Sequence, residues 1–194
     1  LTLGTSMLSF AATGWQEEDG TWRYYDKDGE AVTSVWRKSG NDFFWLDEDG
    51  DMATDQLVED NDNYYYINES GAMVKNQWRE LENEDKQDDD DSDTAWYYFG
   101  ADGKAYKAKD SGKVNFKSIV RADGVTKKYA FDEQGKMLYG WIDEQGERQT
   151  GDDAWQTGVY YLGAANDGAM RSHQWERLDV VDDDQTNDEF QDWY

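Results

Sequence analysis

The fold is decided by the stretch GWQEEDGTWRYYDKDG, residues 14–29, because its pattern returns along the chain. Its central run, Trp22-Arg23-Tyr24-Tyr25, is rich in aromatic residues, and the dipeptides Asp19-Gly20 and Asp28-Gly29 stand before and after it. A short aromatic run bounded by such turn dipeptides is the local signal of a β-hairpin. The stretch therefore predicts one hairpin followed by a glycine turn.

The same pattern recurs in a fixed register. The sequence spacing between successive turn glycines is 21 and 21, and then 32, 32 and 33. They are Gly29, Gly50, Gly71, Gly103, Gly135 and Gly168. Each repeat starts at an opening residue, and we number the repeats 1 to 7 in that order. The opening residues are Trp15, Trp36, Leu57, Trp78, Asp110, Trp141 and Trp175.

Two classes of repeat follow from the spacing between the opening residue and the aromatic triplet. This spacing is 7 in repeats 1 to 3 and 18 in repeats 4 to 6. We therefore expect three short repeats, with a period of 21, over 14–77. Long repeats with a period of about 32 are expected over 78–194, where the last is incomplete and the array is continuous. Residues 1–13 carry no charge and are interpreted as a signal-peptide remnant or an N-terminal arm.

Strand side chains alternate between two faces, so the aromatic residues can be sorted by position. The middle residue of each triplet and the residue two places on are apolar in every repeat except at Arg23. We expect this face to form the core between stacked hairpins. The first and third triplet residues are aromatic in four repeats and include lysine, alanine and valine elsewhere. These outer rings either hold a ligand or pack on neighbouring hairpins, and the sequence leaves both interpretations open.

Composition excludes several classes of protein. The chain has 44 acidic and 19 basic side chains, a net charge of −25 and no cysteine. That charge excludes a nucleic-acid binder that neutralises phosphates, and the absence of cysteine excludes a disulfide scaffold or thiolate zinc site. The aromatic content of 15%, from 10 Trp, 13 Tyr and 7 Phe, argues against a disordered chain.

The sequence predicts no catalytic residue, no metal site and no cofactor. Motifs for a serine nucleophile, a phosphate loop or a zinc protease are absent. The single histidine, His173, occupies a place that other repeats fill with Ser34, Asp55 and Asn76, which indicates ordinary surface. More than half of the segment between Trp78 and Trp96 is acidic, and we interpret this run as a solvated loop rather than a calcium site.

Three stretches, Trp36 to Gly50, Tyr64 to Trp78 and Gly168 to Trp175, resemble the cell-wall-binding repeat of Gram-positive surface proteins. That family includes choline-binding modules, glucan-binding repeats and the repetitive oligopeptides of clostridial toxins. The resemblance implies an all-β solenoid, a superhelix of stacked β-hairpins with one hairpin per repeat.

The resemblance also implies ligand cages between successive hairpins. Each cage combines the opening Trp, the first aromatic residue of the triplet and an aromatic residue of the next repeat. The match fails at Leu57, Asp110, Lys128 and Val159. The matching ligand-binding positions are Trp15, Trp22, Trp36, Phe43, Tyr64, Trp78, Trp96, Trp141 and Trp175.

The leading functional prediction is a non-catalytic, secreted cell-surface attachment module. Its partners would be choline-bearing or glycan cell-wall polymers, held in aromatic clefts between hairpins. One alternative is a protein-interaction or adhesin array with degenerate cages, whose partner would be a host or bacterial surface protein. Another is the repeat region of a larger surface enzyme.

Overall fold

The computed structural model describes residues 13–86, 91–109, 111–151, 153–181 and 189–193, with side chains up to Arg177. The chain divides into two compact units, an N-terminal unit over residues 1–75 and a C-terminal unit over 76–194. The expected signal-peptide remnant or arm, residues 1–13, lies outside the described residues except for Thr13.

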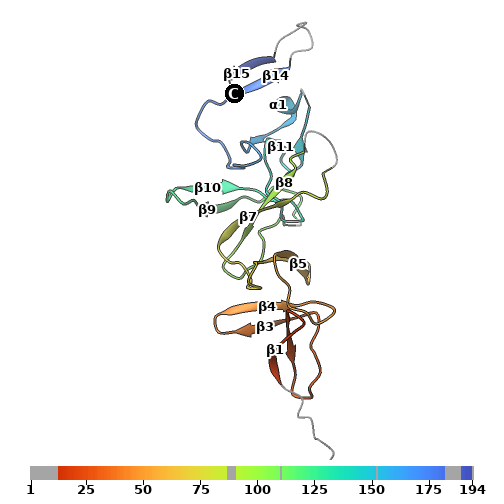
Figure 1. The fold of residues 1–194 in the computed structure, drawn as a ribbon. Helices are drawn as coiled ribbons and strands as arrows, with labels where there is room; N and C mark the ends of the chain where they lie inside the picture. The colour runs from red at the N-terminus through yellow and green to blue at the C-terminus, as the bar shows by residue number, and fades with distance from the viewer. Residues whose placement is uncertain (1–12, 87–90, 110, 152, 182–188, 194) are drawn as a thin grey trace, which may run out of the picture. The chain divides into compact units, whose positions relative to one another are not determined.

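The N-terminal unit consists of three antiparallel hairpins, one for each short repeat (Figure 1). Repeat 1 forms β1 (Gly14–Glu18) and β2 (Thr21–Tyr25), and repeat 2 forms β3 (Val35–Ser39) and β4 (Asp42–Leu46). Repeat 3 forms β5 (Gln56–Asp60) and β6 (Asn63–Ile67). The predicted all-β fold of paired hairpins is confirmed, and each short repeat forms one hairpin.

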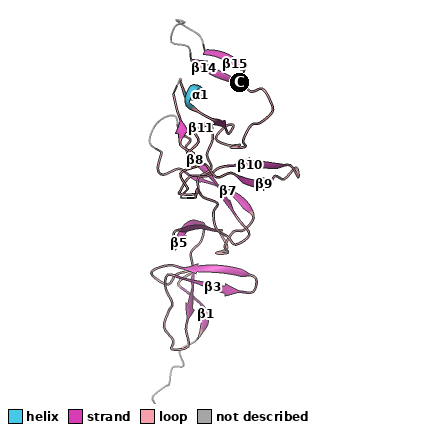
Figure 2. Cartoon of the chain, turned by 180° about the vertical axis from the view of Figure 1, so that it is seen from behind, coloured by secondary structure: helices cyan, strands magenta, loops and turns pink. Residues whose placement is uncertain are grey.

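The long repeats of the C-terminal unit fold in different ways although they share one spacing. Repeat 4 forms a hairpin from β7 (Gln77–Glu82) and β8 (Thr94–Phe99), and repeat 5 forms one from β9 (Lys117–Val120) and β10 (Thr126–Tyr129). The remaining elements are β11 (Trp141–Ile142), β12 (Arg148–Gln149), α1 (Ala154–Thr157), β13 (Tyr160–Tyr161), β14 (Arg177–Val181) and β15 (Glu189–Trp193). In the described part of the chain α1 is the only helix (Figure 2), and no helix there is long and apolar enough to cross a membrane.

Each hairpin ends in a turn that its own side chains stabilise. The Asp47 carboxylate accepts the backbone N–H groups of Asp49 and Asp51, both over 2.9 Å. Asp and Asn stabilise turns in this way because the short side chain reaches the backbone two residues on. Gly50 follows with a φ of +81°, a left-handed conformation that glycine adopts without steric cost.

The segment after each turn joins two hairpins through its backbone. In repeat 2, Ala53 donates its N–H to the Trp45 carbonyl of the same hairpin over 2.9 Å. One residue earlier, Met52 donates to the Trp22 carbonyl of the preceding hairpin over 2.8 Å. The same inter-repeat bond joins Met73 to Phe43, Met137 to Trp96 and Met170 to Lys128.

Burial confirms the predicted core face in most repeats. Tyr65, Tyr97 and Tyr129, which are middle residues of their triplets, are buried, as are the apolar side chains two places further on: Leu46, Ile67, Phe99, Phe131 and Leu162. Arg23, the exception in the sequence pattern, is half-buried and its Nε donates to the Asp51 carboxylate over 2.6 Å.

The outer face differs from the expectation at two places. Tyr66 and Ala130, third residues of their triplets, are buried as well. The segment after the turn bonds to the third triplet residue in both repeats, Val74 to Tyr66 and Leu138 to Ala130. The same pairing occurs at Trp45, whose side chain stays half-buried, so it does not by itself bury this position.

The histidine position has a conformational explanation. Ser34, Asp55, Asn76 and His173 all have φ between 48° and 56°. Small polar residues and histidine are enriched in this left-handed conformation, so the position selects for backbone geometry. His173 therefore needs no catalytic role.

Candidate ligand-binding clefts

A cavity of about 240 Å³, which we call the aromatic cleft, lies between repeats 4 and 5 in the C-terminal unit. Its walls include Trp78, Trp96, Tyr129 and Met137. The rings of Trp78 and Tyr129 lie 4.9 Å apart at 63°, and those of Trp78 and Trp96 lie 6.5 Å apart at 72°. These tilted rings surround a small space with several aromatic surfaces.

The β7–β8 register explains how these residues meet. Trp78 pairs with Tyr98, and Glu80 pairs with Trp96 two places further along. Residues two apart on a strand share a face, so Trp78, Glu80 and Trp96 lie on the same side of the hairpin. The bond from Met137 N–H to the Trp96 carbonyl, 2.7 Å long, then brings repeat 5 against this face.

Charged groups at the cleft are largely paired with one another. Arg121, at the tip of the β9–β10 hairpin, lies 3.5 Å from the Asp167 carboxylate. Arg171 binds the other oxygen of Asp167 over 2.6 Å. Burial raises the pKa of Tyr129, so its ring is a neutral phenol at physiological pH.

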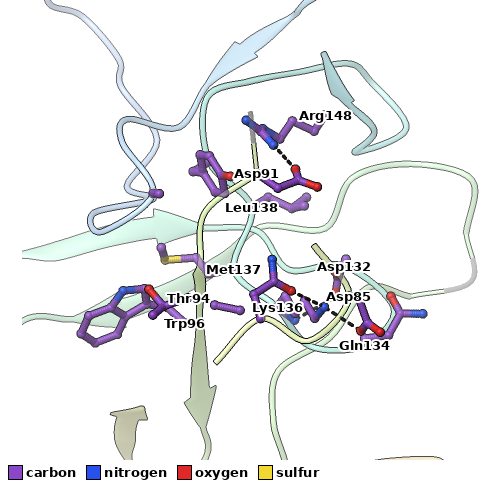
Figure 3. Close-up of a pocket in the computed structure, with 14 residues that line it drawn as sticks. Asp85, Asp91, Thr94, Trp96, Asp132, Gln134, Lys136, Met137, Leu138 and Arg148 are labelled. Atoms are coloured by element: carbon purple, nitrogen blue, oxygen red, sulfur yellow. Dashed lines mark hydrogen bonds and ion pairs between the residues drawn. The ribbon is translucent and has the colours of Figure 1, made fainter. Parts of the chain in front are cut away.

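A second cavity of about 590 Å³, which we call the polar groove, shares Trp96 and Met137 with the aromatic cleft (Figure 3). Lys136 Nζ lies 2.8 Å from both Asn83 Oδ1 and Asp85 Oδ2. Because burial outweighs the bonds that favour its charged form, the pKa of Asp132 is raised. The groove therefore presents amide, carboxylate and ammonium groups beside an indole.

The ends of the acidic loop in repeat 4 are fastened to later repeats. Arg148 Nη1 contacts Asp91 Oδ1 at 2.6 Å, and its guanidinium lies 4.2 Å from the centroid of the Tyr139 ring. The Tyr139 hydroxyl accepts the Ser92 N–H over 2.9 Å. The solvated-loop interpretation is wrong for Asp91, because its side chain is only 28% exposed and pairs with Arg148 of repeat 6.

The rest of the acidic run, Asp88–Asp90, lies outside the described residues. In the part of the chain that is described, no cluster of acidic or histidine side chains could hold a metal.

One donor on the wall between the two cavities has no partner within the described part of the chain. The indole Nε1 of Trp96 is buried and makes no hydrogen bond to any described residue. Buried N–H groups are almost always bonded, so this one is an exception that calls for an acceptor.

Repeats 1 and 2 repeat the arrangement of the aromatic cleft. Trp15 lies 5.4 Å from Phe44 at 72°, as Trp78 lies against Tyr129. Met52 bonds to the Trp22 carbonyl as Met137 bonds to Trp96. Trp22 is 41% exposed, so its ring remains open to solvent.

Residues 32–78 match the model of the choline-binding repeat, and residues 13–31 and 91–105 match that of the putative cell wall binding repeat. These segments are similar to cell-wall-binding repeats, the family that the sequence pattern resembles. These matched segments include both strands of the hairpins in repeats 1 to 3 and the β8 strand of repeat 4.

Solved structures show the same fold. Choline-binding protein F from Streptococcus pneumoniae is 24% identical, with a TM-score of 0.52, over 87% of this chain and 48% of that protein. CbpJ from Streptococcus pneumoniae is 22% identical, with a TM-score of 0.51, over 82% of this chain and 42% of that protein. The chain thus spans less than half the length of these structures. A search of curated protein sequences gives no match.

The other ligand-binding positions predicted from the sequence differ in their surroundings. Trp36 packs on the core residues Ala53, Val58 and Ile67, and its Nε1 donates to Asp60 over 3.1 Å. Phe43 and Tyr64 are half-buried. Trp141 lines a cavity of about 380 Å³ with Val159 and Tyr161, and Trp175 is 74% exposed. The structure thus brings Trp78 and Trp96 together in one cavity, whereas Trp36 contributes to the core.

Sequence reasoning missed Tyr129 and its counterparts as cleft residues. They occupy the middle of the triplet, which the alternation rule assigns to the core, and Tyr129 is indeed only 3% exposed. One edge of its ring nevertheless closes the cleft of the preceding repeat. The available signal was that this position is always aromatic from repeat 2 to repeat 6: Phe44, Tyr65, Tyr97, Tyr129 and Tyr160.

Proposed function

We propose that the chain is a non-catalytic, secreted cell-surface attachment module that binds choline groups of cell-wall polymers. The observation that carries the proposal is the aromatic cleft, in which Trp78, Trp96 and Tyr129 surround one cavity. The choline-binding repeat model, which matches residues 32–78, supports the same ligand class. The equivalent ring arrangement in repeats 1 and 2, with Trp15, Trp22 and Phe44, is the second proposed site.

The chemistry of the cleft suits a quaternary ammonium ion. A trimethylammonium group has no N–H to donate, so aromatic faces are its natural partners. Each such contact contributes about 0.5–2 kcal/mol. Glu80 stands opposite Trp96 in the hairpin, and its carboxylate adds a favourable field for a cation.

The unpartnered Trp96 indole favours a ligand that also carries oxygen. Choline and its phosphate esters carry such an oxygen two carbons from the ammonium group. The Trp96 N–H would then gain the hydrogen bond that it lacks among the described residues.

A glycan component is a second candidate, because the polar groove adjoins the aromatic cleft through Trp96 and Met137. Sugars bind where a ring covers their apolar face and amide or carboxylate groups bind their hydroxyls. The groove offers Asn83, Gln134 and Asp132 for this purpose. Choline and sugar residues of one polymer would then occupy neighbouring cavities.

Calorimetric titration tests the proposal with choline, its neutral analogue 3,3-dimethylbutan-1-ol, and dextran. Choline should bind more tightly than the neutral analogue, by roughly 2- to 30-fold for each cation–π contact. Trp96→Leu should weaken choline binding, whereas Trp155→Leu, a change of another partly exposed tryptophan outside the cleft, should not. Equal affinity for choline and the neutral analogue would contradict the proposal, and tight dextran binding without choline binding would favour the glycan alone.

A further inference from the structure

The ring of Phe43, between repeats 2 and 3 of the N-terminal unit, is already in contact with cations of the chain itself. Lys75 Nζ lies 4.7 Å from the centroid of this ring, and Lys38 Nζ lies 5.7 Å from it. Both distances are within the range of a cation–π interaction. Phe43 is the counterpart of Trp96 in the aromatic cleft, so these ammonium groups occupy the ring that a bound choline would need.

Lys38 is positively charged at a position where repeats 1, 3 and 4 have a negatively charged glutamate. The residue opposite the first triplet aromatic is a glutamate in three hairpins: Glu17 faces Trp22, Glu59 faces Tyr64 and Glu80 faces Trp96. In repeat 2, Lys38 faces Phe43 at the same position. Directly opposed side chains lie close together, so this position sets the local charge at the ring. A glutamate there attracts a cation and a lysine repels one.

Lys75 reaches the ring because of the backbone bond between repeats. Met73 donates its N–H to the Phe43 carbonyl over 2.8 Å, and Lys75 follows two residues later on the same side. The equivalent residue in repeat 2 is Thr54, two residues after Met52, which bonds to Trp22. The threonine has no cation to place over a ring.

The other rings at this junction have partners of their own. The Trp36 ring lies 4.9 Å from Tyr65, and its indole N–H donates to Asp60. Trp78 in the aromatic cleft, by comparison, faces a cavity. A ligand at Phe43 would therefore have to displace a tethered ammonium group.

We infer that the junction of repeats 2 and 3 is closed to quaternary ammonium ligands by Lys38 and Lys75. A tethered group competes at a high effective concentration, so free choline is at a disadvantage. The inference rests on the proposed function, because it states which of the candidate clefts are used.

The test is the number of choline equivalents bound by the double variant Lys38→Glu, Lys75→Thr. This variant gives the junction the residue types of Glu17 and Thr54 in the preceding junction. The control Lys27→Glu, Lys104→Thr changes the net charge equally at exposed lysines that contact no aromatic ring among the described residues. Calorimetry and choline-soaked crystals give the stoichiometry and the location.

The double variant should bind one more equivalent of choline than the wild type and the control. Adding Phe43→Ala to the double variant should remove the gained equivalent. If the wild type binds choline at Trp78 and Trp96 and the double variant gains nothing, the inference is overturned and the proposed function stands. Choline on Phe43 in wild-type crystals would also overturn it. If no variant binds choline, both the inference and the proposed function are overturned. If only the double variant binds one equivalent of choline, the inference is supported and binding at Trp96 is contradicted.

Discussion

Met137 donates its backbone N–H to the carbonyl oxygen of Trp96 over 2.7 Å, and this bond sets the position of repeat 5 against the ring of repeat 4. The same bond holds Met52 to Trp22 and Met73 to Phe43. Stacking therefore depends on main-chain groups that are present whatever side chain stands at the first triplet position. Lys128 accepts the bond as well as a tryptophan does. Side chains at this position are free to differ in ligand binding while the fold is kept.

The first prediction separates the two faces of the hairpins. Trp22→Ala should weaken choline binding and lower the free energy of unfolding by less than Tyr65→Ala does, because the Trp22 residue is 41% exposed. Tyr65→Ala should lower it by about 3–5 kcal/mol, as for other buried aromatic residues. Urea denaturation followed by tryptophan fluorescence measures both. A larger loss of stability for Trp22→Ala than for Tyr65→Ala would contradict the assignment of faces.

The hairpins and their register could be predicted because they depend on local signals. Turn glycines and aromatic runs recur at fixed spacing, and alternation along a strand is enough to place Ile67 and Phe99 in the core. Trp78 and Trp96 could be paired for the same reason, since the template assigns both to one hairpin.

Contacts between repeats could not be predicted, because they depend on tertiary geometry. Tyr129 packs in the core and also lines the cleft, whereas alternation along one strand assigns a residue to one face only. Lys75 contacts the Phe43 ring although the β5–β6 hairpin lies between them in the sequence, and Arg148 pairs with Asp91, which is 57 residues away in the sequence. The equal spacing of the long repeats also concealed different structures, because the inserted residues in repeats 4, 5 and 6 have unrelated sequences.

A second prediction concerns the close packing of turn glycines on the preceding repeat. Gly71 has a φ of +83°, and a Cβ built there would lie 2.6 Å from Cε of Met52. Gly71→Ala should therefore lower the free energy of unfolding by about 2 kcal/mol, since backbone strain and displacement of Met52 add together. The control Gly40→Ala, with a φ of +60° and open space around the Cβ, should cost about 1 kcal/mol from strain alone. Equal losses in urea denaturation would show that Met52 yields without cost.

A third prediction uses the turn carboxylate of repeat 5. Burial raises the pKa of Asp132, so the native state holds this proton more tightly than the unfolded state. Its contribution to stability is present at acidic pH and is lost as the pH rises through the raised native pKa. Asp132→Asn should thus be more stable than the wild type at pH 7, and the difference should vanish below the unfolded pKa of about 3.9. Asn68 shows that an amide suits this turn, because its Oδ1 accepts the Ala72 N–H over 2.9 Å.

Asp26 supplies the control of opposite sign for thermal melts across pH. Backbone hydrogen bonds from Glu30 and Asp28 lower the pKa of the Asp26 carboxyl. Asp26→Asn should be less stable than the wild type at pH 7, and this deficit should disappear as the pH falls through the lowered native pKa. Parallel pH profiles for the two variants would contradict the assigned shifts.

A fourth prediction tests the carboxylate beside the aromatic cleft. Glu80 faces Trp96 across the β7–β8 hairpin, and its Oε1 accepts the Thr94 hydroxyl over 2.7 Å. Glu80→Gln keeps an oxygen for Thr94 and removes the charge, so the fold should be unchanged. A surface charge pair contributes about 0.3–1 kcal/mol, which corresponds to a loss of choline affinity of roughly 2- to 5-fold at low salt. The loss should shrink at 1 M salt, where screening acts over about 3 Å.

The control is Glu133→Gln, which removes an equal charge at an exposed site away from the cleft and should leave the affinity for choline unchanged. An unaltered affinity in Glu80→Gln, or equal losses in both variants, would show that the field at Trp96 does not come from Glu80.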